Sequence, residues 1–144
     1  MSIVLSSSLE DYLESIMELR KRNGVVRITD ISQELSVEKS SVNSAVKKLK
    51  NLKLVTHERY EDIHLTEQGE LAAIEIRKKH ETLTLFFSEF LGIPPLEAEK
   101  DACRIEHVIA DKTFDRLSGF IAFLQENFSG EIENWKKTRE DQPD

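Results

Sequence analysis

In this 144-residue sequence, seven side chains of the types that bind transition metals are spaced so that helices could bring them together. Cys103, Glu106 and His107 are spaced i, i+3, i+4, so their side chains emerge from one face of a helix. Four oxygen and nitrogen donors complete the set: Asp11, Glu14, His80 and Glu99. Because a divalent transition ion takes roughly four to six donors that converge from several directions, these residues indicate a metal site.

The same residues also suit ordinary structural roles. Asp11 and Glu14 are spaced i, i+3 on the polar side of a predicted helix, where charges are simply solvated, and Cys103 suits a small core position. His80 directly follows the basic run 77–79, while Glu106 and His107 suit an exposed surface. A small metalloenzyme would use similar donors, although the sequence contains no Gly-rich loop or nucleophile elbow. The residues alone leave these interpretations open.

The composition is that of a helix-rich globular protein. Hydrophobic residues make up 39% and charged residues 33% of the chain, with five Gly and three Pro, which excludes collagen-like and low-complexity sequences. No apolar run approaches the ~18 residues of a membrane span, and no basic-then-apolar segment at the N-terminus indicates a secretory signal. With a single cysteine, we expect a reducing compartment, the cytoplasm.

Apolar periodicity predicts a mainly α fold. Three helices precede two short β-type runs at 54–57 and 63–65. The first helix runs over about 9–22, the second is capped by Thr29 and holds Ile31 and Leu35, and the third carries an apolar stripe from Val42 to Leu49. This is the order of a winged helix-turn-helix domain. Helices over 66–91, about 95–110 and 112–127 then predict an all-helical second domain. We expect domain ranges of 1–70 and 71–127, followed by a polar tail or loose helix over 128–144.

Charge is distributed unevenly and indicates a nucleic-acid surface. Residues 1–66 hold ten basic and ten acidic residues, whereas residues 67–144 hold ten basic and seventeen acidic ones. Within the neutral part, the stretch 39–53 has five lysines and no acid. In the third helix, an apolar stripe must face the core, and the remaining positions face outward: Lys39, Ser40, Ser41, Asn43, Ser44, Lys47 and Lys48.

Those outward residue types suit double-stranded DNA. Hydroxyl and amide groups bind base edges and lysines bind phosphates, so the third helix is expected in the major groove, with Arg59 and Tyr60 of the hairpin tip on the backbone. A merely solvated basic helix, or a winged helix used for protein contacts, is the alternative interpretation.

At this point the sequence resembles the diphtheria-toxin-repressor family of metal-dependent transcriptional regulators. The motifs that carry the resemblance occur in family order over about residues 8–127: Leu9–Glu14, Ile31–Leu35, Ser40–Val42, Leu65–Gly69, Lys79-His80 and Ala102–His107. The chain is similar in particular to the short two-domain form, the manganese-transport-regulator branch.

The resemblance implies a ligand set of mixed character. Asp11 and Glu14 match ligands of the manganese branch, whereas Cys103 matches the iron-sensing branch, which has a thioether at position 11. We expect a primary ion on Asp11, Cys103, Glu106 and His107, and a neighbouring ion on Glu14, His80 and Glu99. A thiolate favours softer ions and carboxylates favour harder ones, so Mn(II) or Fe(II) is expected first, with Zn(II) and Co(II) also possible.

The implied function is regulation rather than catalysis. The resemblance implies a homodimeric repressor of metal-uptake genes that binds palindromic operator DNA when a divalent ion bridges the first helix to the fourth and fifth. The dimer interface is expected from the Phe-rich end of the long helix together with the fifth and sixth helices. We expect neither a membrane nor a small organic substrate as a partner. A winged-helix regulator that ignores metal remains the main alternative.

Overall fold

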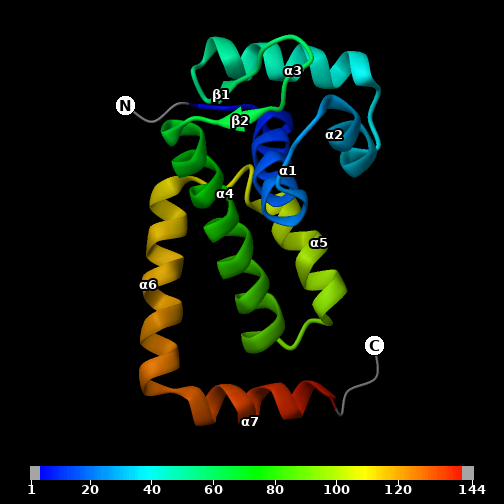
Figure 1. Cartoon of the computed structure of the whole chain (residues 1–144). Coiled ribbons are helices and arrows are strands. Elements are labelled where there is room, and N and C mark those ends of the chain that lie inside the picture. Colours follow the sequence, from blue (N-terminus) through cyan, green and yellow to red (C-terminus); the bar gives the residue numbers. More distant parts are fainter. Residues whose placement is uncertain (1–3, 141–144) are drawn as a thin grey trace. The chain divides into compact units, whose positions relative to one another are not determined.

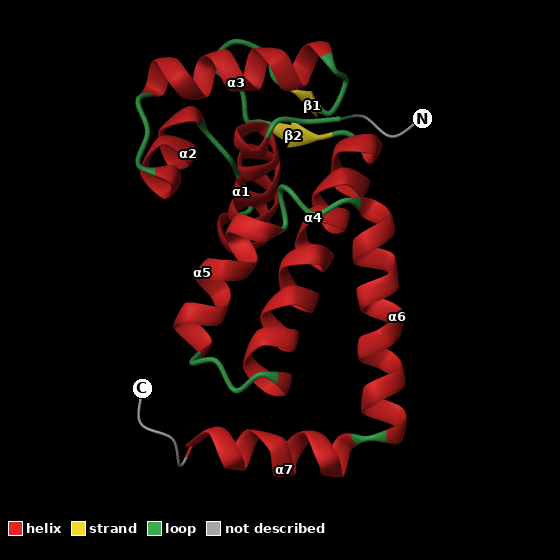
Figure 2. Cartoon of the chain, turned by 180° about the vertical axis from the view of Figure 1, so that it is seen from behind, coloured by secondary structure: helices red, strands yellow, loops and turns green. Residues whose placement is uncertain are grey.

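The computed structural model describes residues 4–140 and divides the chain into two compact units. The boundary lies between Arg77 and Lys78, inside helix α4 (Glu67–Leu85), and therefore later than residue 70, where the sequence analysis ended the first domain. The chain is mainly α-helical, as the apolar periodicity predicts (Figures 1 and 2). Among the helices of residues 4–140, none is long and apolar enough to cross a membrane.

The first unit is a three-helix core with a small hairpin. Its elements before α4 are α1 (Ser7–Asn23), α2 (Ile28–Leu35), α3 (Lys39–Asn51), β1 (Val55–Thr56) and β2 (His64–Leu65). The two strands pair antiparallel, with Val55 opposite Leu65, which confirms the predicted hairpin in a shorter form. The winged helix-turn-helix order is thus present in the structure.

Local signals explain where these helices begin and end. The Ser6 hydroxyl accepts a hydrogen bond from the Leu9 N–H at 3.3 Å and caps α1, and Gly24 ends that helix with a left-handed φ of 77°. The Thr66 hydroxyl accepts from the Gly69 N–H at 3.1 Å at the start of α4. Apolar side chains of all three helices and the hairpin then form one buried core, which includes Leu13, Ile16, Ile31, Val42, Leu49, Leu54 and Ile63.

The start of α4 approaches the backbone between α3 and β1 so closely that only glycine fits. A Cβ atom on Gly69 would lie 1.9 Å from the Leu54 carbonyl oxygen, which is far inside van der Waals contact. The same carbonyl accepts a hydrogen bond from the Thr66 N–H at 3.0 Å. The first turn of α4 is therefore tied directly to the end of α3.

The second unit contains the end of α4 and four further elements. They are the π-helical turn η1 (Phe86–Phe90), α5 (Pro95–Ile105), α6 (Asp111–Asn127) and α7 (Ser129–Glu140). Contacts join η1 to both α5 and α7, and α6 to α7. Buried apolar side chains within this unit include Leu83, Phe90, Phe114 and Ile121.

Three boundaries differ from the sequence analysis. The regular α-helix ends at Leu85 instead of continuing to 91, because the Leu91 N–H bonds to the Phe86 carbonyl in a wider turn. The fifth helix ends at Ile105 and is followed by a hydrogen-bonded turn instead of reaching 110. Residues 129–140, expected as a tail or loose helix, form α7, and 141–144 lie outside the described residues.

A partly buried carboxylate fixes the hairpin to α1. Asp62 accepts hydrogen bonds from the Val26 N–H and, at 2.8 Å, from the Arg20 guanidinium, which also donates to the Ile63 carbonyl. Partial burial raises the pKa of Asp62, but the hydrogen bonds from Val26 and Arg20 outweigh it and hold that pKa below its ordinary value. The ionised carboxylate therefore stabilises the folded hairpin.

We expect Asp62→Asn to lower the free energy of unfolding by about 1–2 kcal/mol at pH 7, because a charge-assisted hydrogen bond to Arg20 is lost. Since the pKa of Asp62 is depressed by folding, its contribution is present above the unfolded pKa and is lost as pH falls through the folded pKa. Urea unfolding of both proteins across the acidic range measures this. Glu61→Gln, an exposed neighbour, is the control and should change little. Equal stability of Asp62→Asn and the wild type at pH 7 would contradict the argument.

Candidate metal centre and nucleic-acid interface

Three of the predicted ligands gather at the end of α5. Cys103 lies on the last turn of the helix, and Glu106 and His107 lie in the turn that follows. The Glu106 N–H still bonds to the Ala102 carbonyl at 2.9 Å, so the helical spacing of the three side chains persists past the end of the helix. One donor atom from each residue lies within 4.8 Å of the others. The prediction that they share one face is confirmed.

Glu106 is the most unusual residue of this group because its carboxylate is fully buried. Its side chain is 0% exposed, and Oε2 lies 2.8 Å from Nδ1 of His80 on α4. Oε1 lies 3.5 Å from Nε2 of His107 and accepts no hydrogen bond from the described residues. A buried carboxylate oxygen in that condition is costly unless a hydrogen-bond donor or a cation satisfies it.

The hydrogen bond to Glu106 also orients His80. When Nδ1 carries the proton that is donated to Glu106, the lone pair of the imidazole is on Nε2, the form in which a histidine binds a metal. Nε2 lies 4.0 Å from Oε1 of Glu99, whose side chain is 61% exposed. Residues of α4 and α5 in the second unit thus present nitrogen and carboxylate donors near each other.

Asp11 and Glu14 belong to the first unit, on α1. Glu14 is only 16% exposed, and its Oε1 lies 3.5 Å from the Arg77 guanidinium of α4. Asp11 is half-buried on the same helix. The sequence analysis placed both as metal ligands and did not anticipate the contact with Arg77, for which only the basic run 77–79 gave a local signal.

The donor set fits a divalent transition ion. The second unit alone supplies a thiol, an imidazole and a buried carboxylate oxygen within 4.8 Å of one another. Oxygen, nitrogen and sulfur donors in combination suit Mn(II), Fe(II), Co(II) and Zn(II), and a divalent charge would neutralise the buried Glu106. The residues present therefore match the group that the sequence analysis expected.

The exposed face of α3 is the one that the apolar stripe predicts. Val42, Ala45, Val46 and Leu49 are buried. Every residue predicted to face DNA from this helix is exposed: Lys39, Ser40, Ser41, Asn43, Ser44, Lys47 and Lys48. Among the described residues, Lys47 and Lys48 form no ion pair with a carboxylate, so their charges remain available to phosphates.

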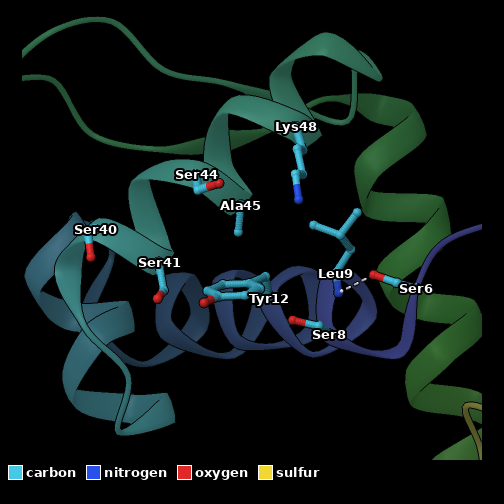
Figure 3. A pocket seen from close by; sticks show the side chains of 9 residues that line it. All are labelled: Ser6, Ser8, Leu9, Tyr12, Ser40, Ser41, Ser44, Ala45 and Lys48. Carbon is cyan, nitrogen blue, oxygen red and sulfur yellow. Dashed lines mark hydrogen bonds between the residues drawn. The ribbon is translucent and has the colours of Figure 1, made fainter.

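A hollow of about 390 Å³ lies between α3 and the start of α1 (Figure 3). Its wall carries hydroxyl groups from both helices, and the Lys48 side chain extends over it from α3. The sequence analysis identified the α3 side of this wall but not the α1 side, namely Ser6 and Ser8. In the sequence, only the run of three serines before Leu9 indicates that hydroxyl groups gather at this point.

The hairpin tip differs from a simple basic wing. Tyr60 is 91% exposed, and the Arg59 guanidinium lies 5.1 Å from the centre of its ring. Lys50, one of the five lysines of the basic stretch, donates to the His57 carbonyl at 2.9 Å and lies 3.6 Å from Glu58. This lysine therefore holds the hairpin against α3, a role that charge counting along the sequence does not reveal.

Comparison with known proteins finds related sequences along nearly the whole chain. Residues 4–63 match the family model "iron dependent repressor, N-terminal DNA binding domain", and residues 66–133 match "iron dependent repressor, metal binding and dimerisation domain". An uncharacterised HTH-type transcriptional regulator of Methanocaldococcus jannaschii is 37% identical over 118 residues, which are 81% of this chain and 94% of that protein.

Two further relatives point to manganese regulators. The HTH-type transcriptional regulator MntR of Shouchella clausii is 35% identical over 120 residues, 83% of each chain. The solved structure of the manganese regulator SloR is 30% identical with a TM-score of 0.70, and the match covers 80% of this chain and 54% of that one. The chain thus spans about half the length of that solved structure.

The reactivity of Cys103 provides a direct test of the α5 cluster. In metal-stripped protein, we expect one exposed thiol per chain to react with a disulfide reagent. Zn(II) should slow that reaction at least about tenfold, because a coordinated thiolate is a poorer nucleophile. Absorbance of the released thiolate gives the rate. Glu106→Gln should lose the protection, whereas Glu97→Gln, an exposed carboxylate at the other end of α5, should keep it. Equal rates with and without metal would remove Cys103 from the site.

Proposed function

The chain belongs to the iron-dependent repressor family, also called the diphtheria-toxin-repressor family, and we propose that it represses metal-uptake genes by binding palindromic operator DNA as a metal-loaded homodimer. Members of this family are transcriptional regulators and not enzymes, and they respond to divalent transition metals. Beyond family membership, we propose for this chain a ligand set, a DNA surface, a palindromic operator, metal-uptake genes as targets and a cytoplasmic location.

The observation that carries the proposal is the buried Glu106 carboxylate beside His107 and Cys103. In the proposed primary site, Asp11 joins these three residues as the fourth ligand. Glu14, His80 and Glu99 are the proposed ligands of a neighbouring ion. A bound ion supplies positive charge that neutralises carboxylates which would otherwise repel one another.

The proposed ligands are distributed over both units, and this distribution accounts for the effect of metal on DNA binding in the proposal. The proposed ligands Asp11 and Glu14 are on α1, which packs on α3, whereas the other five are on α4, on α5 and in the turn after α5. Donors from both units on shared ions would restrict the conformations that the chain samples. Affinity for an operator falls with the fraction of molecules in the competent conformation, so metal raises it by increasing that fraction.

Metal choice follows from the mixed donors. Asp11, Glu14, Glu99 and Glu106 are hard oxygen donors that suit Mn(II) and Fe(II), whereas Cys103 adds affinity for softer ions such as Zn(II) and Co(II). Fe(II) binds to both oxygen and thiolate donors, whereas Mn(II) suits the oxygen donors, which are the majority of the set. We therefore propose Mn(II) or Fe(II) as the regulatory ion, with Zn(II) and Co(II) binding as well.

The proposed dimer interface uses the elements that the sequence analysis expected. In the Phe-rich segment Phe90 is buried and Phe86 packs on both Phe87 and Phe90, while Leu85 is exposed. Further large apolar side chains are exposed on and after α5 and α6: Leu96, Val108, Phe120, Phe123 and Phe128. We propose that a second copy of the chain covers these side chains.

Metal dependence of DNA binding tests the proposed function. Fluorescence anisotropy of DNA from the chain's own upstream region should show binding only when Mn(II) or Fe(II) is added to anaerobic, metal-stripped protein at fixed salt. Glu106→Gln should lower affinity in saturating metal by about tenfold or more, because the buried ligand loses its charge. Glu97→Gln is the matched control. Equal binding without metal would favour a winged-helix regulator that ignores metal.

Salt dependence, measured in saturating metal, tests the DNA surface separately from the metal ligands. Lys47→Ala should weaken binding to every sequence and reduce the slope of log affinity against log salt by about one, because one phosphate contact is lost. Lys21→Ala, an exposed lysine of α1 beside Glu18, should leave the slope unchanged. The slope is measured from titrations at several salt concentrations. An unchanged slope for Lys47→Ala would show that this face of α3 does not lie against phosphates.

A further inference from the structure

Glu14 already has a cationic partner in the chain. Its Oε1 lies 3.5 Å from NH1 of Arg77, and both residues belong to the first unit, on α1 and α4. Glu14 is 16% and Arg77 37% exposed, so water screens this pair less than it would screen a surface pair. A guanidinium stays protonated at every physiological pH, and its charge therefore persists.

The position of Arg77 on α4 brings this charge to the face that carries His80. Arg77 precedes His80 by three residues within α4, and side chains at that spacing emerge from the same face of a helix. His80 and Glu14 are two of the three ligands proposed for the neighbouring ion. The guanidinium thus binds one of these ligands and lies one turn from another.

We propose that Arg77 is an internal counter-ion of Glu14 that competes with the second metal ion, so that the chain binds one ion per protomer over the concentration range of the primary site. This inference rests on the proposed function, because it concerns the second of the two ions proposed there. The neighbouring ion has to displace Arg77 from Glu14 and also meets repulsion from the guanidinium. The primary site, with its thiol, imidazole and buried carboxylate, does not use Glu14.

Metal stoichiometry tests this directly. Metal-stripped protein is dialysed against buffered Mn(II) over a range of free concentrations, and bound manganese is counted by atomic emission. The wild type should bind one ion per chain before a much weaker second one. Arg77→Gln should bind the second ion at least about tenfold more tightly, and therefore bind two per chain where the wild type binds one. Arg77→Lys, which keeps the charge, should behave as the wild type.

Each outcome decides the matter. Two ions of similar affinity in the wild type, one ion in Arg77→Gln, or a Lys variant that behaves as the Gln variant would each overturn the inference while leaving the proposed function intact. No manganese bound to the wild type would overturn both. Arg77→Met keeps the aliphatic stem and replaces Arg77→Gln if that variant unfolds, as judged by circular dichroism. In the Arg77→Gln background, Glu14→Gln should return the stoichiometry to one.

Discussion

The proposed metal site depends on one fully buried carboxylate, that of Glu106. Removing Glu106 from water costs free energy, which its contacts with His80 and His107 only partly offset. The turn after α5 and the later part of α4 hold these groups together. In the proposed site, a divalent ion supplies positive charge to this carboxylate. In that proposal, the affinity for metal originates in the electrostatic cost of burying Glu106.

Most of the fold follows from local sequence, because helix periodicity and capping act over a few residues. The stripe from Val42 to Leu49 predicts both the core face and the exposed face of α3, and Thr66 and Gly24 mark helix ends correctly. The sequence does not predict the wide turn at Phe86–Phe90 and leaves α7 open as a tail or a loose helix, because both depend on packing among η1, α5, α6 and α7. No local pattern encodes such contacts.

For the candidate site, too, local sequence predicts one part and only the tertiary structure shows the rest. The spacing of Cys103, Glu106 and His107 predicts that they meet, since one helical segment carries all three. The pairing of Glu14 with Arg77 joins residues far apart in the sequence, and so does the contact of Lys50 with the hairpin. Counting charges assigned Lys50 to a basic patch, yet the folded chain uses it to hold His57. Residue types indicate the chemistry, whereas only the tertiary structure shows which charges are already paired.

Helix α4 connects the Glu14–Arg77 pair to the hairpin of the first unit. Its first turn contacts the Leu54 backbone through Gly69, so the start of α4 is fixed to the end of α3. From Gly69 to Arg77, within the first unit, the helix rises about 12 Å at ~1.5 Å per residue. The Glu14–Arg77 pair holds α1 against α4 at the far end of that stretch. A ligand that draws Glu14 away from Arg77 therefore acts on the contact between α1 and the helix that supports the hairpin. In the proposed function, competition between a metal ion and Arg77 for Glu14 therefore acts within the unit that carries the DNA-binding elements.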